Sequence, residues 1–307
     1  MTDEQTTATF EIEQPEAAAA AVAAPTVKGA AIVYSGEPDA DDAAEHFHEA
    51  SKLYPSFGLR QTRGHLLDVR VDLRHSTTRA VKRYRTARRV ELPRTQLPDT
   101  PLEQAIAQRQ SHRRFTDASI HLEHLAALLH AGYGITHQLV SPAQLDAPPR
   151  REPGPYLRTV PSGGGLYPLE LFVFAYAVDG LQPGVYHYDP PAHRLDELSV
   201  VPAAELRRRA ASAAVYPELA GGGAALIVLS AMFWRTRFKY GLRGYRFALI
   251  EAGHVAQNVL LTATALRLGS VPLGGLFDRR IDELLDLDGV NESVLYAVSV
   301  GRVDESV

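Results

Sequence analysis

The chain of 307 residues contains no cysteine. A disulfide framework, a thiolate metal site and a cysteine nucleophile are therefore excluded. The sequence also lacks a run of about 18 apolar residues, which excludes a membrane-spanning helix. Its twelve histidines provide no second group of ligands at a spacing typical of metal centres, so we expect no metal site.

Charge of one sign is not in excess either. The net charge is −4, whereas nucleic-acid-binding proteins usually carry a strong basic excess. The N-terminus, MTDEQTTATFEIEQPE, is acidic where a signal peptide would be basic. Hydrophobic residues make up 45 % of the chain, which is enough for an ordinary core. We therefore expect a cytoplasmic protein that binds neither nucleic acid nor membranes.

Three regions follow one another along the chain. Residues 1–45 are rich in alanine, proline and acidic residues, and this composition predicts a disordered arm. Residues 46–98 have a mixed pattern, in which alternation over 65–73 predicts a strand. Residues 99–307 contain the longest periodic segments, so we expect the main domain there.

Helices and strands alternate irregularly in this main domain. Pro101 and Glu103 suit the first turn of a helix, and 121–135 has a helical apolar stripe that ends near Gly132. The other predicted elements are a proline-rich loop at 139–160, strands at 169–178, 224–233 and 293–301, a hairpin at 180–198 and a long buried helix at 245–269. Because no strict βαβ rhythm appears, we predict an α+β fold.

Basic side chains with a hydroxyl between them follow the first helix of this domain. Arg109, Ser111 and Arg113 are spaced two residues apart, at the expected C-terminal end of that helix. Two guanidinium groups and a hydroxyl group can clamp a phosphate by charge-assisted hydrogen bonds. The alternative interpretation is a solvated basic patch.

Two glycine-rich segments are candidates for close contact with a ligand. PSGGGLYP, residues 161–168, lets the backbone approach a planar molecule. It lacks the Gly-Lys-Ser/Thr ending of a Walker loop, and it precedes a strand, unlike the dinucleotide fingerprint. VPLGGLFD, residues 271–278, is predicted to be a second Pro/Gly turn after the long helix. A plain turn and a helix-to-strand connector are the alternatives.

Lysine is scarce, with four residues against 28 arginines, yet Lys239 directly precedes Tyr240. Tyrosine has an ordinary pKa near 10. A neighbouring ammonium group lowers the pKa of the phenol, while burial lowers the pKa of the lysine. Either group can then act as a general base, whereas arginine keeps its proton. The alternative is an exposed lysine beside a core tyrosine. Since a strand would send the two side chains to opposite faces, we expect a loop conformation here.

In this order along the chain the motifs resemble the FMN-dependent nitroreductase superfamily. More narrowly, the chain is similar to SagB-type azoline dehydrogenases, which oxidise thiazolines and oxazolines in ribosomally made peptides. The resemblance covers about residues 100–302 and rests on GGGLYPLELFVF, GVYHYD and EAGHVAQN. FHEASKL and KRYRTARRVELP resemble the N-terminal region of that family less specifically.

The resemblance implies a nitroreductase-like fold: a central, mostly antiparallel sheet flanked by helices, in a domain-intertwined homodimer with FMN at the interface. The residues that it assigns to FMN are Arg109, Gln110, Ser111, Arg113, Pro161, Ser162, Gly163, Leu273, Gly274, Gly275 and Arg302. The four at 109–113 and the arginine at 302 would hold the phosphate and ribityl groups, while the two glycine-rich segments would lie on either side of the flavin ring. Lys239 and Tyr240 match the catalytic pair of that family.

The function that the resemblance implies is oxidation of peptide thiazolines or oxazolines to thiazoles or oxazoles, with dioxygen as the electron acceptor. The expected partners are an azoline-containing precursor peptide, a second copy of the chain and a cyclodehydratase complex. Two alternatives stay open: an NAD(P)H-dependent nitro or quinone reductase on the same fold, and a non-catalytic scaffold for a cyclodehydratase.

Overall fold

The computed structural model describes residues 42–53, 81–94, 96–138 and 156–304. The chain divides into two compact units, residues 1–46 and 47–307, and the fold described here is that of the second unit. Most of the predicted arm at 1–45, the whole predicted strand at 65–73 and most of the predicted loop at 139–160 lie outside the described residues. Within the described ranges no helix is long and apolar enough to cross a membrane.

The elements follow in chain order. The helices are α1 (Ala43–Ala50), α4 (Leu102–Gln108), α5 (Leu122–Tyr133), the 3-10 turn η2 (Gly163–Gly165), α7 (Ala203–Ser212), α8 (Pro217–Gly222), α9 (Trp234–Tyr240), α10 (Arg243–Ala265) and α11 (Asp278–Leu284). The strands are β1 (Arg88–Glu91), β2 (Ile120–His121), β3 (Ile135–Gln138), β4 (Tyr156–Arg158), β5 (Leu169–Ala175), β6 (Val178–Asp179), β7 (Gly184–Asp189), β8 (Arg194–Val200), β9 (Ala225–Met232), β10 (Gly269–Leu273) and β11 (Glu292–Gly301).

A seven-stranded sheet forms the centre of the unit, in the order β1-β8-β7-β5-β9-β11-β10 within the described residues. All neighbouring strands in it are antiparallel. The only parallel pairing in the part of the chain that the structure describes joins the short strands β2 and β6. The predicted α+β fold with a mostly antiparallel sheet is therefore confirmed.

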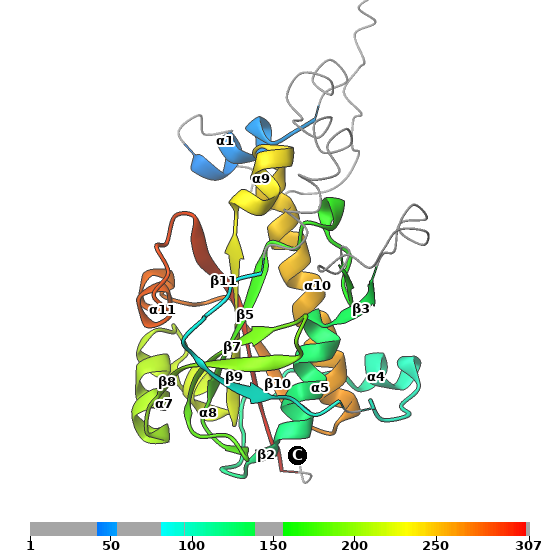
Figure 1. Ribbon diagram of the computed structural model, residues 1–307, viewed down its shortest axis with the longest axis vertical. Coiled ribbons are helices and arrows are strands. Elements are labelled where there is room, and N and C mark those ends of the chain that lie inside the picture. Colours follow the sequence, from blue (N-terminus) through cyan, green and yellow to red (C-terminus); the bar gives the residue numbers. More distant parts are fainter. Residues whose placement is uncertain (1–41, 54–80, 95, 139–155, 305–307) are drawn as a thin grey trace, which may run out of the picture. The chain divides into compact units, whose positions relative to one another are not determined.

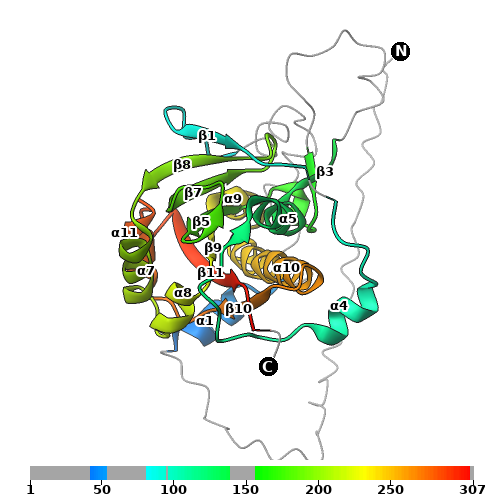
Figure 2. The same cartoon turned by 90° about the horizontal axis from the view of Figure 1, so that it is seen from below.

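Helices cover both faces of this sheet (Figure 1). Figure 2 shows α5 and α10 side by side on one face, and α7, α8 and α11 on the other. Side chains alternate along a strand, so Leu171 and Val173 of β5 enter the core under α5 and α10, whereas Phe172 and Phe174 enter the opposite core. With both faces covered, β5 is buried along its whole length. This explains why its sequence, apart from the ion-paired Glu170, is apolar without the polar alternation of a half-exposed strand.

Most of the strongly periodic segments form the elements that the sequence predicts. The helix starting near Pro101 is α4, the stripe at 121–135 is α5, and the long helix is α10, which spans 23 residues. The hairpin is β7 and β8, with its turn at 190–193. The predicted turn at 271–278 is wrong in its first part, because residues 271–273 belong to β10. Val271 and Leu273 are buried there, and Pro272 is tolerated because β10 is an edge strand.

Candidate active site

The glycine-rich segment forms a tight turn between β4 and β5. Gly164 has φ +68°, in the left-handed region where a side chain is strained. The turn is closed by a hydrogen bond of 2.9 Å from the Tyr167 N–H to Ser162 Oγ. Three consecutive glycines therefore allow a compact loop, in which Gly164 is exposed.

Lys239 and Tyr240 are the last two residues of the short helix α9. The predicted loop conformation is therefore wrong. Successive side chains of a helix are rotated by about 100°, which still allows two of them to reach one point between them. Lys239 Nζ lies 5.3 Å from the centroid of the Tyr240 ring, and both side chains are half-buried.

The point on which the two side chains converge is Gly164. A Cβ atom built on Gly164 would lie 2.7 Å from Tyr240 Oη and 3.3 Å from Lys239 Nζ. A real Cβ does not tolerate the shorter distance, so the hydroxyl and ammonium groups occupy the space that the missing side chain leaves. The structure thus brings together two segments that the sequence analysis selected separately.

The preceding glycine of the loop, Gly163, packs against the start of α10. A Cβ on Gly163 would lie 2.9 Å from the Phe247 ring. That ring also makes an edge-to-face contact with Tyr240, at 5.0 Å between ring centroids. Phe247 therefore limits the movement of both the loop and the phenol.

A buried ion pair attaches α9 to the sheet. Arg235 of α9 makes an ion pair of 2.5 Å with Glu170 of β5 and donates a hydrogen bond to the Tyr167 carbonyl at 3.2 Å. Burial alone would raise the pKa of Glu170, but the Arg235 charge and the hydrogen bond with His187 hold it well below its usual range. Because Tyr167 directly follows the glycine-rich turn, Arg235 fixes α9 relative to that turn.

A second buried carboxyl group, Glu251 of α10, interacts with Ser162 of the turn. The Tyr133 hydroxyl donates a hydrogen bond of 2.7 Å to Glu251 Oε1 and accepts the Leu169 N–H at 3.1 Å. Burial raises the pKa of Glu251 to about 7, against the opposing effects of hydrogen bonds from Ser162 and Tyr133. The two buried carboxyl groups near the turn, Glu170 and Glu251, therefore have opposite pKa shifts.

The arginine-rich segment lies in irregular chain after α4. Its backbone is tied to β10, because the His112 N–H donates to the Ser270 carbonyl at 2.9 Å. Arg302 joins the same region: its carbonyl accepts the Thr116 N–H at 2.8 Å, and its Nε donates to the Ser119 carbonyl at 3.1 Å. Arg302 therefore lies beside residues 116–119, which follow the segment that holds Arg109, Gln110, Ser111 and Arg113.

The two groups of predicted site residues lie at opposite ends of α10. The glycine-rich turn contacts Phe247 in the second turn of that helix, whereas His112 packs beside Gly269, just after the helix ends. The helix between Phe247 and Ala265 rises by about 27 Å at 1.5 Å per residue. One subunit does not, therefore, place Arg109 and Arg113 beside Lys239 and Tyr240.

The remaining predicted residues, Leu273, Gly274 and Gly275, lie at the end of β10 and directly after it. The Leu273 side chain is buried in the core under α7, α8 and α11, so only its backbone is available to a ligand. Gly274 is exposed and lies near the Tyr296 ring, and Gly275 accepts the Val215 N–H at 2.9 Å.

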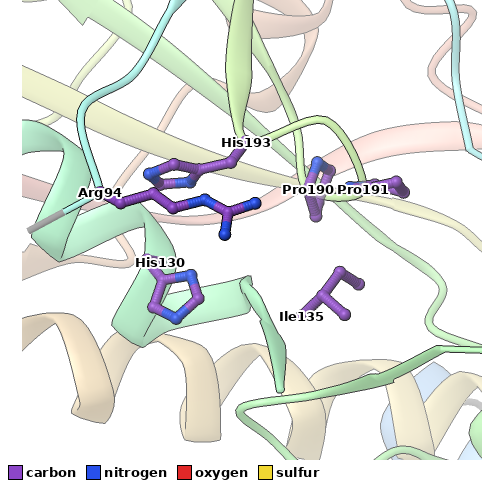
Figure 3. Close-up of a pocket in the computed structure, with 6 residues that line it drawn as sticks. All are labelled: Arg94, His130, Ile135, Pro190, Pro191 and His193. Carbon is purple, nitrogen blue, oxygen red and sulfur yellow. The ribbon is translucent and has the colours of Figure 1, made fainter. Parts of the chain in front are cut away.

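A separate cavity of about 360 Å³ is lined by Arg94, His130, Ile135, Pro190, Pro191 and His193. In Figure 3 the Arg94 guanidinium group lies beside the two imidazole rings, which make an edge-to-face contact at 5.4 Å between their centroids. Burial and the neighbouring His193 and Arg94 lower the pKa of His130. None of these six residues belongs to the predicted site, so this cavity is not the candidate active site.

Comparison with known proteins settles the family. The nitroreductase family model matches residues 106–302, which include the arginine-rich segment, the glycine-rich turn and the Lys239-Tyr240 pair. The chain belongs to the nitroreductase family.

Two curated relatives and one solved structure illustrate this membership. The chain is 36 % identical to the nitroreductase homologue MJ1384 of Methanocaldococcus jannaschii over 214 residues, covering 67 % of this chain and 95 % of that protein. It is 31 % identical over 165 residues to the microcin B17-processing protein McbC of Escherichia coli, covering 50 % of this chain and 57 % of McbC. Its fold is similar to a nitroreductase homologue from Anabaena variabilis, with a TM-score of 0.63 and 23 % identity, over 89 % of this chain and 49 % of that one.

Four residues that shape the site were not predicted from the sequence to have a part in it. Phe247 and Glu251 lie inside the long helix, where their pattern is that of a buried face. Tyr133 is the last residue of a helix whose pattern is that of a buried core helix. Arg235 is one of 28 arginines, and nothing in the sequence distinguishes it from the others. The tight packing of Gly164 against Tyr240 joins positions far apart in the chain, which no local pattern reveals.

Proposed function

We propose that this nitroreductase-family protein is an FMN-dependent, SagB-type azoline dehydrogenase that converts peptide thiazolines or oxazolines to thiazoles or oxazoles. The observation that carries the proposal is the convergence of Lys239 Nζ and Tyr240 Oη on the bare backbone of Gly164. A reductase that takes hydride from a nicotinamide has no need of a paired base beside its flavin loop. The relation to McbC, named as a microcin B17-processing protein, supports a peptide as the substrate.

The donor set fits FMN. Arg109 and Arg113 offer guanidinium groups for its phosphate, with Ser111 and Gln110 as polar contacts and Arg302 nearby. At the turn Pro161 is exposed and Ser162 and Gly163 are half-buried, and the glycines let a planar ring come close to the backbone. Leu273, Gly274 and Gly275 offer backbone groups at the end of β10. When bound, FMN would supply a hydride acceptor at N5, with dioxygen as the final electron acceptor.

We infer that a second copy of the chain completes the site. A single flavin cannot bridge about 27 Å between the arginine-rich segment and the glycine-rich turn of one subunit. Large apolar side chains also lie exposed on α4 and α10, the two helices near these groups: Leu102, Ile106, Leu249 and Ile250. A homodimer that buries these side chains would place the arginines of one subunit beside the turn of the other.

The chemistry of the chain's own residues is proton abstraction. The α-carbon proton of an azoline is acidified by the ring C=N bond and by the peptide carbonyl, so a moderate base suffices. Lys239 and Tyr240 are close enough for one to take this proton while the other stabilises the resulting charge. The hydride leaves from the adjacent ring carbon, and one molecule of azole is formed for each pair of electrons removed.

A second candidate is an NAD(P)H-dependent nitro or quinone reductase, which the relation to the nitroreductase homologue MJ1384 favours. The two functions differ in their reductant and in their need for a base. Purified protein should be incubated in air with a thiazoline-containing peptide and no nicotinamide, and separately with NADPH and a nitroaromatic compound. We expect loss of two hydrogens from the peptide, measured by mass spectrometry, and slow NADPH oxidation. The reverse result would favour the reductase, and colourless protein that binds no FMN would favour a scaffold.

The proposed partners follow from the same assignment. An azoline-containing precursor peptide is the substrate, and a cyclodehydratase must form the azoline ring before this protein can oxidise it. Whether the two enzymes form a stable complex is tested by co-purification of the cyclodehydratase with this chain.

A further inference from the structure

A buried carboxyl group beneath the glycine-rich turn has an unusual environment. Glu251 is only 2 % exposed. Its Oε1 accepts the Tyr133 hydroxyl at 2.7 Å, and the Tyr133 oxygen in turn accepts the Leu169 N–H. Tyr133 is fully buried, so its single proton has Glu251 as its acceptor. One oxygen of the carboxyl group is thereby fixed as a hydrogen-bond acceptor.

The other oxygen, Oε2, is buried and receives no close hydrogen bond from any described residue. An ionised oxygen in such a place is costly, whereas a protonated one can itself donate. The loop residue whose hydroxyl interacts with this carboxyl group is Ser162. Its Oγ already accepts the Tyr167 N–H at 2.9 Å, which leaves one acceptor position and one proton on the hydroxyl.

The charged and titratable groups that face Glu251 come from three elements and from the turn before β5. They are Tyr133 of α5, Arg158 of β4, Tyr167 before β5 and Arg235 of α9. The two arginines favour the ionised carboxylate, but burial outweighs them and keeps the pKa of Glu251 at about 7. Both protonation states are therefore accessible near neutral pH.

The protonation state of Glu251 decides which way the Ser162 hydroxyl points. If Glu251 is protonated, Ser162 Oγ can accept from Oε2, and its own proton turns away from α10 toward the exposed side of the turn. If Glu251 is ionised, the Ser162 proton turns inward to satisfy the carboxylate. We propose that Glu251 is a positioning residue: in its protonated form it makes Ser162 an outward hydrogen-bond donor to the ligand held by the glycine-rich turn.

This inference rests on the proposed function in one respect, namely that the ligand is FMN, whose ring oxygens and nitrogens accept hydrogen bonds. The glutamate itself can be examined without the cofactor. Infrared spectra of the full chain, recorded on both sides of pH 7, should show a protonated carboxyl band that disappears with a midpoint of about 7. The band should be missing in Glu251→Gln and unchanged in Glu283→Gln, a control at an exposed position on α11. A carboxyl group that is already ionised well below pH 7 would overturn the inference.

The effect on Ser162 is measured by FMN binding to the apoprotein, followed by quenching of flavin fluorescence. Loss of one neutral hydrogen bond should weaken wild-type binding about 3- to 10-fold as the pH rises through the Glu251 titration. Glu251→Gln should lack this step, since an amide can donate to Ser162 and accept from Tyr133 at any pH. Ser162→Ala should bind more weakly without the step, and Glu283→Gln should behave as wild type.

The FMN phosphate also titrates in this pH range, but its effect on binding is the same for every variant and cancels when the variants are compared. A Glu251→Gln variant that keeps the wild-type step would overturn the inference. Absence of FMN binding in the wild type would contradict the proposed cofactor instead, while the infrared titration would still decide the state of Glu251.

Discussion

The backbone of Gly164 lies directly against the hydroxyl group of Tyr240, since a methyl group at Gly164 would come within 2.7 Å of Tyr240 Oη. This contact joins the turn between β4 and β5 to the end of α9. Gly164 is exposed, and under the proposed function it marks the point at which Lys239 and Tyr240 would meet the substrate.

The first prediction concerns this contact. Gly164→Ala should displace Tyr240 and Lys239 and lower the rate of azoline oxidation by about 10-fold or more, because a misplaced base loses much of its catalytic effect. Gly165→Ala is a matched control. Gly165 has nearly the same φ, +65°, but a Cβ there would have its nearest neighbour 4.0 Å away. Both variants carry the same backbone strain, so equal rates would show that the contact itself has no role.

The second prediction concerns the phosphate site. Arg109→Ala and Arg113→Ala should each weaken FMN binding by about 10- to 100-fold, the scale of one charge-assisted hydrogen bond, and the double variant should purify colourless. Arg114→Ala, an exposed neighbour outside the predicted set, should stay yellow. Flavin absorbance per subunit is the measurement. Full flavin content in the double variant would place the phosphate elsewhere.

The third prediction concerns the second subunit. Ile250→Glu puts a charge on the exposed apolar face of α10 and should convert a dimer to a monomer. Because the arginine-rich segment and the glycine-rich turn then come apart, the monomer should lose its flavin. Val290→Glu, at an exposed site before β11, should keep both the dimer and the flavin. Light scattering and absorbance measure the two properties, and a yellow monomer would contradict the two-subunit site.

The fourth prediction concerns stability against pH. The pKa of Glu251 is raised from 4.5 to about 7 in the folded chain. Between these values the folded state binds a proton that the unfolded state has released, so stability is highest at the acidic side and falls as the pH rises toward 7. The shift corresponds to about 3 kcal/mol. Relative to Glu251→Gln, the wild-type free energy of unfolding should fall by that order between pH 4.5 and 7. A constant difference between the two proteins would show that Glu251 does not titrate there.

Local patterns predict much of this fold because α5, α10 and β5 each have a periodicity that burial imposes. The arginine-rich segment and the glycine-rich turn are likewise visible in sequence, since their residue types are unusual. The conformation of Lys239 and Tyr240 was not predictable in this way. The need for both side chains to reach one point excluded a strand, in which they would alternate. A short helix that ends at Gly241, which has φ +56°, brings the two side chains together as well as a loop would.

The burial of Glu251 could not be predicted from a local sequence pattern either. A glutamate within an apolar helix reads as one polar position among many, and its raised pKa depends on Tyr133, Ser162 and the closed turn above it. Tyr133 and Ser162 lie 118 and 89 residues away from Glu251 in the sequence. The separation of the arginine-rich segment from the glycine-rich turn along α10 was not predictable from a local pattern either, because it follows from the three-dimensional path of the chain.

One substitution distinguishes which of Lys239 and Tyr240 is the base. Lys239→Arg keeps the positive charge but removes a group that can accept a proton. Partial activity in this variant would identify Tyr240 as the base with a cation beside it, whereas complete loss would favour Lys239 itself.

The central claim is tested most directly by the rate at which flavin-loaded protein removes two hydrogens from a thiazoline peptide in air, without nicotinamide. The wild type should form the thiazole. Lys239→Ala and Tyr240→Phe should each be slower by about 10²-fold or more, the scale of general acid–base catalysis, with their flavin content unchanged. Near wild-type rates in both yellow variants, or no thiazole from the wild type, would contradict the account.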